Sequence, residues 1–176
     1  MENVKKYPKS MIVIHWITVV LFAIIFYVGT TLDDYEFSEA NMNRFRTHAL
    51  LGVLVALLTI IRYFIKKKNK DRLPADITYY SPMHEKFVKL VLGLMYPLLI
   101  ITPIVGFIMV YQTGALGYDL GGAFPTGAKF SETLEVLHKI LVFTLTGLIV
   151  LHIAGVVMYK VKTGENLIKR MCLLIK

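Results

Sequence analysis

The sequence predicts an all-α integral membrane protein, a bundle of four transmembrane helices with both termini in the cytoplasm. Its 176 residues are 56% hydrophobic and yet carry a formal net charge of +8. That combination fits neither a soluble globular domain nor a disordered chain. Four windows lack Asp, Glu, Lys and Arg altogether, namely residues 10–32, 47–61, 90–118 and 140–159. We expect helices over about 10–31, 47–65, 87–111 and 137–160, in a single domain that covers residues 1–176.

The first two helices need separate justification. Crossing the hydrocarbon takes about 20 mostly apolar residues, and the first window meets this length. It contains His15 and Trp16 and lacks a small-residue cleavage site, so we interpret it as a helix of the mature protein and not as a signal peptide. The second window is shorter than a span. We therefore expect Arg62 to extend from the far end of its helix toward the headgroups.

The third and fourth windows are long enough to span without help. Pro97 and Pro103 interrupt the third helix, where a missing N–H and a steric clash should kink it. The fourth helix contains two histidines, His138 and His152. We expect the four helices to run alternately outward and inward through the membrane.

Basic residues set the expected orientation, because Lys and Arg resist translocation. Most of the 20 Lys and Arg residues lie at the N-terminus, in the connector 62–89 and at the C-terminus. The opposite side holds only Arg44, Arg46, Lys129 and Lys139, together with Asp33, Asp34, Glu36, Glu39, Asp119, Glu132 and Glu135. The positive charge therefore belongs to the inner face, with lipid headgroups as its partner. Nucleic acid is not expected as a partner, since the chain offers no folded basic domain.

Cysteine usage limits the cofactor chemistry. Cys172 is the single cysteine, so the chain has neither an intramolecular disulfide nor a CxxCH site for covalent haem. The basic run "KKKNKDR" at 66–72 reads as a solvated cytoplasmic connector.

The histidines fall at two depths. His15 lies about one turn inside the inner end of the first helix, and His48 lies at the outer end of the second. His138 and His152 are fourteen residues apart, which places them on one helix face at depths that differ by ~21 Å. The depths pair His48 with His138 near the outer surface and His15 with His152 near the inner surface. Ionisable residues inside a membrane helix usually face the bundle interior and mark a function.

Two ligands per depth favour haem over a bare metal ion. Zinc or copper usually takes three or four protein ligands, and no Cys, Asp or Glu lies at helix depth. A haem iron needs only two axial ligands, and bundles build cofactor sites from facing side chains. Gly52, four residues after His48, is a candidate for haem clearance, or alternatively for close helix packing. Arg44 and Arg46 are candidates for pairing with haem propionates, or alternatively exposed loop residues.

Several stretches resemble the bacterial cytochrome b561 family, whose fold is shared with the haem b subunits of nickel–iron hydrogenases. They are "IHW" in the first helix, "RTHALLG" in the second, "ITPIVGFIMVY" in the third, and "LHK" and "LHIAG" in the fourth. The resemblance covers essentially the whole chain. It implies a multi-pass protein of the bacterial inner membrane with two non-covalent b haems and electron exchange with quinone. The family's haem ligands match His15, His48, His138 and His152.

Within this family the chain looks closest to the superoxide oxidases. That likeness implies that an electron from superoxide at the periplasmic face passes through both haems to ubiquinone. His84, Lys86 and Lys89 are candidates for quinone or proton handling at the inner mouth. Lys89 stands where family members often have a further histidine. No residue is assigned to catalysis itself, since both axial positions of each iron would be filled.

Two other functions remain open from the sequence. The chain could be a quinol-linked electron-transfer subunit that serves a partner redox protein or a periplasmic carrier, without substrate chemistry of its own. It could also be a haem-free membrane protein whose histidines serve helix packing or metal sensing.

Overall fold

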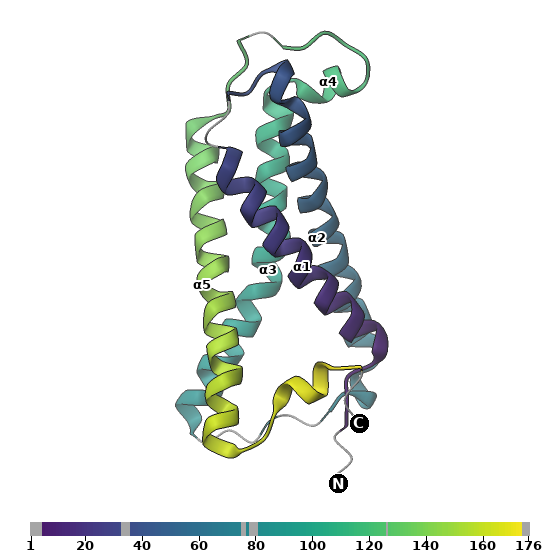
Figure 1. The fold of residues 1–176 in the computed structure, drawn as a ribbon, viewed down its shortest axis with the longest axis vertical. Helices are drawn as coiled ribbons and strands as arrows, with labels where there is room; N and C mark the ends of the chain where they lie inside the picture. Colours follow the sequence, from purple (N-terminus) through teal and green to yellow (C-terminus); the bar gives the residue numbers. More distant parts are fainter. Residues whose placement is uncertain (1–4, 33–35, 75–76, 78–80, 126, 174–176) are drawn as a thin grey trace.

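Four long helices form the structure, a computed structural model that describes residues 5–32, 36–74, 77, 81–125 and 127–173 (Figure 1). They are α1 (Lys9–Leu32), α2 (Met42–Lys68), α3 (Pro82–Gln112) and α5 (Glu132–Thr163). Within the described residues these four helices are long and apolar enough to cross a membrane. The predicted fold class, a transmembrane four-helix bundle, is confirmed. Asp33 and Asp34, counted above among the outer acids, lie outside the described residues.

The helices extend past the apolar windows because their polar ends continue beyond the hydrocarbon. In α3, Ser81 caps the N-terminus and accepts a hydrogen bond from the His84 N–H at 3.1 Å. Pro82 occupies the first turn, where its missing N–H does no harm. His84 therefore lies inside the first turn of α3, whereas the expected helix began only at about residue 87. At its C-terminus, α5 ends on Gly164, whose φ of 75° suits glycine.

In the described parts of the connections the elements are short. They are the 3₁₀ turns η1 (Glu39–Asn41), η2 (Lys70–Arg72) and η3 (Leu167–Met171), and the single-turn helix α4 (Ala115–Asp119).

The long helices pack mainly on their neighbours in the chain. The extensive contacts join α1 to α2, α2 to α3 and α3 to α5. Across the described residues, α1 and α5 share at most sparse contact, and Figure 1 shows the two helices diverging toward the end that carries the termini. The bundle thus depends on the interfaces between long helices that follow one another in the chain.

The C-terminal segment ties α5 back to α1. The Trp16 indole N–H donates to the Met171 carbonyl at 2.7 Å, and the Tyr7 N–H donates to the Arg170 carbonyl at 3.1 Å. In Figure 1, η3 lies between the lower ends of α1 and α5. The segment therefore connects α1 and α5 at the end of the bundle where these two helices diverge.

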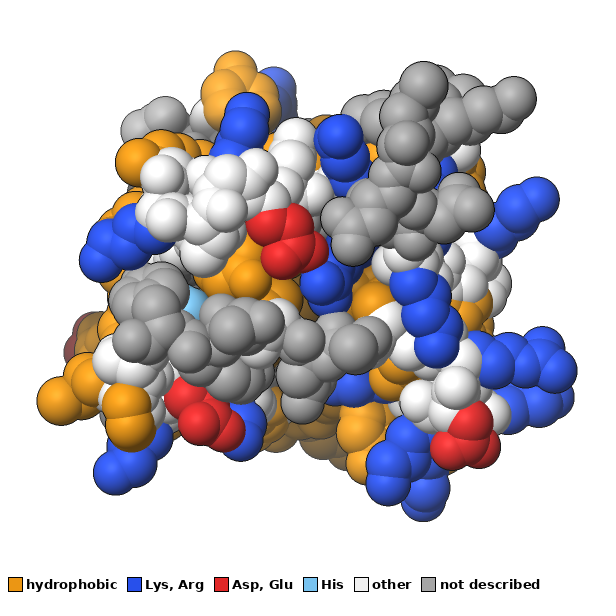
Figure 2. Space-filling view, turned by 90° about the horizontal axis from the view of Figure 1, so that it is seen from below, with side chains coloured by type: hydrophobic (Ala, Val, Ile, Leu, Met, Phe, Trp, Pro, Cys, Tyr) orange, Lys and Arg blue, Asp and Glu red, His pale blue; other side chains and the backbone are white. Residues whose placement is uncertain are grey.

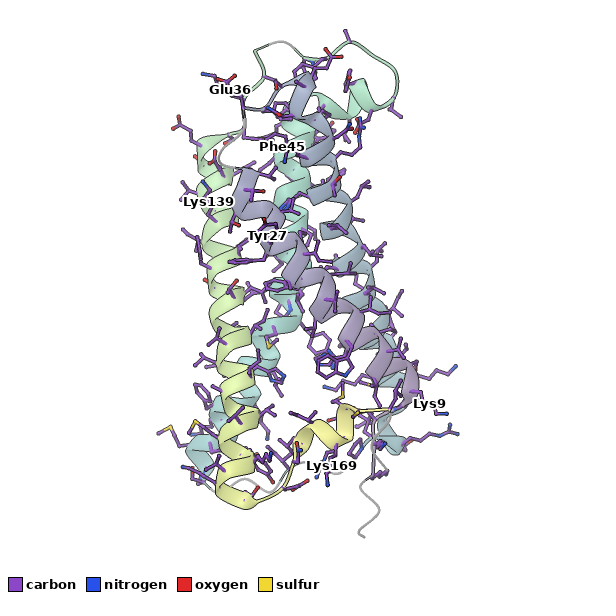
Figure 3. All side chains as sticks on the ribbon, in the orientation of Figure 1. Lys9, Tyr27, Glu36, Phe45, Lys139 and Lys169 are labelled. Carbon is purple, nitrogen blue, oxygen red and sulfur yellow. The ribbon has the colours of Figure 1, made fainter. Side chains whose placement is uncertain are left out.

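Both chain ends lie at this same end of the bundle (Figure 1). Seen from below, it is ringed by Lys and Arg side chains with few acids (Figure 2). Lys9 and Lys169 lie there, while Glu36 lies at the opposite end (Figure 3). The orientation predicted from the sequence would put this basic end in the cytoplasm.

An aromatic cluster, Phe37, Phe45, Phe124 and Phe130, lies at the opposite end of the bundle. The rings of Phe37 and Phe130 are centred 4.7 Å apart. Polar contacts anchor α4 beside the cluster: the Tyr118 hydroxyl donates to Glu39 at 2.9 Å, and Asp119 pairs with Arg46. The bond to Glu39 raises the pKa of Tyr118, because the carboxylate stabilises the protonated phenol.

The orientation makes a prediction for reporter fusions. A cytoplasm-active fluorescent reporter joined after Lys176 should be bright, and alkaline phosphatase inserted near Gly121, in the connector after α4, should be active. Alkaline phosphatase joined after Lys176 should be inactive. The reverse pattern would contradict the orientation. Immunoblots of each fusion control for expression.

Candidate functional site

His48 and His138 meet inside the bundle. Each is the seventh residue of its helix, His48 in α2 and His138 in α5, and these two helices run in the same direction. Their rings are centred 6.2 Å apart with planes at 73°. The predicted outer histidine pair is therefore brought together. This approach follows from two helices that start at the same level and turn the same face inward.

Both rings line a cavity of about 380 Å³ that is walled by all four long helices. Its walls are largely apolar and include the aromatic side chains of Phe22, Phe26, Phe45, Phe107, Phe130 and Phe143. Phe45 lies toward the outer end in Figure 3. Such a lining suits a flat apolar ligand held by a few polar groups.

A glycine faces each of these two histidines. A Cβ atom at Gly29 on α1 would lie 2.8 Å from His48 Cε1, and a Cβ atom at Gly106 on α3 would lie 3.1 Å from His138 Cε1. The first distance is shorter than any ordinary carbon–carbon contact and the second is tight. Each imidazole thus occupies the space that a side chain would take.

The same pattern of backbone carbonyls accompanies the two glycines. Ile25 lies four residues before Gly29, and its backbone interacts with His48. Thr102 lies four residues before Gly106, and its backbone interacts with His138. Neither histidine Nδ1 reaches full hydrogen-bond geometry with these carbonyls. Donation from Nδ1 to a backbone carbonyl would leave Nε2 of each ring for a metal.

Gly52 lies on the wall of the same cavity. A Cβ atom there would lie 3.4 Å from Ile25 Cδ1 and 3.7 Å from Pro103 Cβ. The missing side chain therefore lets α2 approach α1 and α3 closely. This geometry favours the packing role of Gly52, and haem clearance remains a proposal.

The second predicted pair, His15 and His152, lines a smaller cavity of about 80 Å³. Arg62 lines it too, with its Nη1 atom 3.0 Å from His15 Nδ1. The prediction that Arg62 extends toward the headgroups is therefore wrong. Because α2 continues to Lys68, Arg62 lies well inside the helix and on the face that points into the bundle.

The outer pair fits a haem iron. Two imidazole nitrogens bound to one first-row metal at ~2 Å each place their ring centres roughly 6 Å apart, and these rings are 6.2 Å apart. The inner pair brings two imidazoles to one cavity, which is smaller. His15 and His152 stand on α1 and α5, which share at most sparse contact in the described residues, and the same holds for α2 and α5, which carry the outer pair. Each histidine pair thus joins two long helices that have no extensive interface with each other.

The remaining candidates lie away from the two cavities. Arg46 bonds to Asp119 and to Asn43, and neither Arg44 nor Arg46 lines the outer cavity. Lys139 lines it instead and pairs with Glu135 at 2.9 Å.

The quinone candidates gather at the inner end of α3. The His84 ring stacks on Tyr159 with centres 6.4 Å apart, Lys89 pairs with Glu85, and Lys86 is exposed. None of the three lines either described cavity.

Sequence reasoning missed Arg62, Gly29, Gly106 and Lys139 as residues of the sites. A depth comparison could have found the glycines, since both lie near the outer helix ends at the level of His48 and His138. The sequence pattern does not show which way Arg62 turns, because apolar residues such as Ile61 and Phe64 flank it and the bundle interior is apolar as well.

The glycine contacts predict a selective loss. Gly29→Ala and Gly106→Ala should displace the facing imidazole. If each predicted histidine pair holds a haem, the haem content of the purified protein should fall toward half, because only the outer site is disturbed. Pyridine haemochrome absorbance per protein measures this. Gly93→Ala is the matched control in α3, because a Cβ atom there meets nothing within 4 Å. Full haem content and unchanged low-spin resonances in both variants would show that haem binding does not depend on the contacts of Gly29 with His48 and of Gly106 with His138.

The search of curated proteins found no match. A family model described as prokaryotic cytochrome b561 matches residues 6–172 of the chain. That family implies haem b and electron transfer in the membrane, in agreement with the apolar helices and the imidazole pair. Because the match covers nearly the whole sequence, the chain belongs to the prokaryotic cytochrome b561 family.

Proposed function

We propose that this protein carries single electrons across the bacterial inner membrane, from superoxide at the outer face to ubiquinone at the inner face. The observation that carries the proposal is the close approach of His48 and His138 inside the apolar cavity, with a second histidine pair deeper in the same bundle. Two haem b groups, when bound at these pairs, supply the one-electron chemistry.

The proposed ligands are His48 and His138 for the outer haem, and His15 and His152 for the inner haem. If two histidines hold each haem iron, neither iron would offer a site to oxygen or superoxide. The chain's residues then act by holding the imidazoles, fixing their rotation and keeping water out. The apolar lining of the outer cavity and the backbone contacts at Gly29 and Gly106 support these roles.

Superoxide as the donor is supported by the resemblance to superoxide oxidases, and the outer surface adds little to it. An electropositive funnel would speed the capture of an anion. Here Arg46 is paired with Asp119, and Lys139 is paired with Glu135. The superoxide reaction therefore depends on direct access to the outer cavity rather than on electrostatic steering.

The same charges favour a second candidate function, electron exchange with a partner redox protein or periplasmic carrier. Acids predominate among the ionisable residues of the outer loops. Complementary charges accelerate docking, so a basic carrier would suit this surface.

Ubiquinone and its protons are proposed to meet the chain at the inner end, near His84, Lys86 and Lys89. His84 is held by its stack on Tyr159, whose hydroxyl donates to Glu165 at 3.2 Å. This links an imidazole, a phenol and a carboxylate at the inner ends of α3 and α5. Such a set can move protons between the interface and a bound quinone.

The ligand assignment predicts which haem each variant loses. His48→Ala and His138→Ala should each remove the outer haem and spare the inner one, and His15→Ala and His152→Ala should do the opposite. Redox titration followed at the haem absorbance bands resolves the two sites. His84→Ala is the control and should keep both. A folded single variant that loses both haems would contradict the pairing by depth.

The donor assignment predicts a fast reaction with superoxide. In stopped-flow absorbance, oxidised protein mixed with superoxide should show haem reduction, followed by reoxidation when a ubiquinone analogue is present. Superoxide dismutase added first should abolish the signal. Haem that stays oxidised under superoxide, yet is reduced by quinol, would favour the second candidate function.

A further inference from the structure

Arg62 is a charged side chain inside the bundle that the proposed mechanism does not use. It lies on α2, six residues before the helix ends at Lys68, and is flanked by the exposed side chains of Ile61 and Tyr63. Arg62 itself is partly buried and faces the inner cavity with His15 and His152. Arg62 therefore faces the bundle interior, whereas its two neighbours in the chain face outward.

The Arg62 guanidinium lacks a counter-charge in the described part of the chain. Its one hydrogen-bond contact joins Nη1 to the neutral ring of His15, and its buried Nε has no partner there. The cavity wall contributes hydroxyl groups from Thr18, Thr59 and Tyr96 but no acidic side chain. Arginine stays charged at every physiological pH, and an unpaired charge at membrane depth is costly. The site thus suits an anion that the described residues do not supply.

Binding of a haem iron by His15 would remove the one hydrogen-bond acceptor that Arg62 has among the described residues. When a histidine binds iron through Nε2, its Nδ1 carries the proton and becomes a donor. The Arg62 N–H groups are donors as well, so the contact with His15 cannot persist in that state. Arg62 must then turn to a different acceptor within reach of the same cavity.

We infer that Arg62 binds a propionate carboxylate of the haem held by His15 and His152. The inference rests on the proposed function, because it requires a haem at that pair. A guanidinium binds a carboxylate through two parallel hydrogen bonds, a geometry that lysine does not reproduce. The propionate would also supply the negative charge that Arg62 lacks among the described residues.

The pairing has a consequence for the inner haem's midpoint potential. A positive charge near an iron stabilises the reduced form, which carries one more electron. Low dielectric strengthens the effect relative to water. Arg62 therefore makes the inner haem a better electron acceptor and has little effect on the outer haem, which lies about four helical turns away.

Redox titration of the purified two-haem protein tests the inference. Arg62→Gln should shift the inner midpoint to more negative potential and leave the outer midpoint in place, and Arg62→Lys should give a smaller shift. Arg170→Gln is the matched control. Arg170 belongs to η3, at the inner end of the bundle, and is paired with Glu165 at 2.7 Å. An inner midpoint in Arg62→Gln equal to that of the unaltered protein would overturn the inference.

Haem b dimethyl ester, which lacks both carboxylates, separates propionate binding from a general charge effect. Reconstitution titrations should show that Arg62→Gln weakens the binding of haem b at the inner pair much more than the binding of the ester. An equal weakening with both haems would overturn the inference. If Arg62→Gln retains only the outer haem, the same comparison is made with Arg62→Lys. Failure of the unaltered protein to bind haem would instead overturn the proposed function.

Discussion

The structure depends on the constraint that polar side chains in the hydrocarbon need a partner. Four imidazoles and one guanidinium lie along helices that otherwise present apolar surface, including exposed side chains such as Leu50, Phe143 and Val150. The imidazoles of His48 and His138 lie close to each other and against the backbone at Gly29 and Gly106. Their separation would also allow both to bind one metal ion. The approach of these two rings sets the rotation of α2 and α5, and hence which faces of all four helices point inward.

The two sites differ in how far the protein prepares them. The outer site has a large apolar cavity walled by all four long helices, and its two imidazoles already lie at a ligating separation. The inner site has a small cavity and an arginine against one imidazole. Under the proposed function, haem binding would complete the inner site. The C-terminal segment, held by the bond from Trp16 to Met171, limits how far α1 and α5 separate there.

The sequence was sufficient to predict the number of spans and the pairing of histidines by depth, because both depend only on position along a helix. It could not predict lateral contacts, since these depend on rotation about each helix axis and an all-apolar helix has no periodic signal. Gly29 and Gly106 were missed for that reason, although their depth matches the outer pair. Arg62 was misplaced because α2 continues a turn and a half beyond it. The partner of Arg46 was missed because Asp119 is 73 residues away in the chain.

The central claim is that this bundle holds two haem irons, one above the other. Anomalous diffraction from crystals of the purified protein, measured at the iron absorption edge, tests it most directly. The account predicts two iron peaks per chain, one between His48 and His138 and the other between His15 and His152, at depths that differ by ~21 Å. A single peak, or two peaks at the same depth, would contradict it.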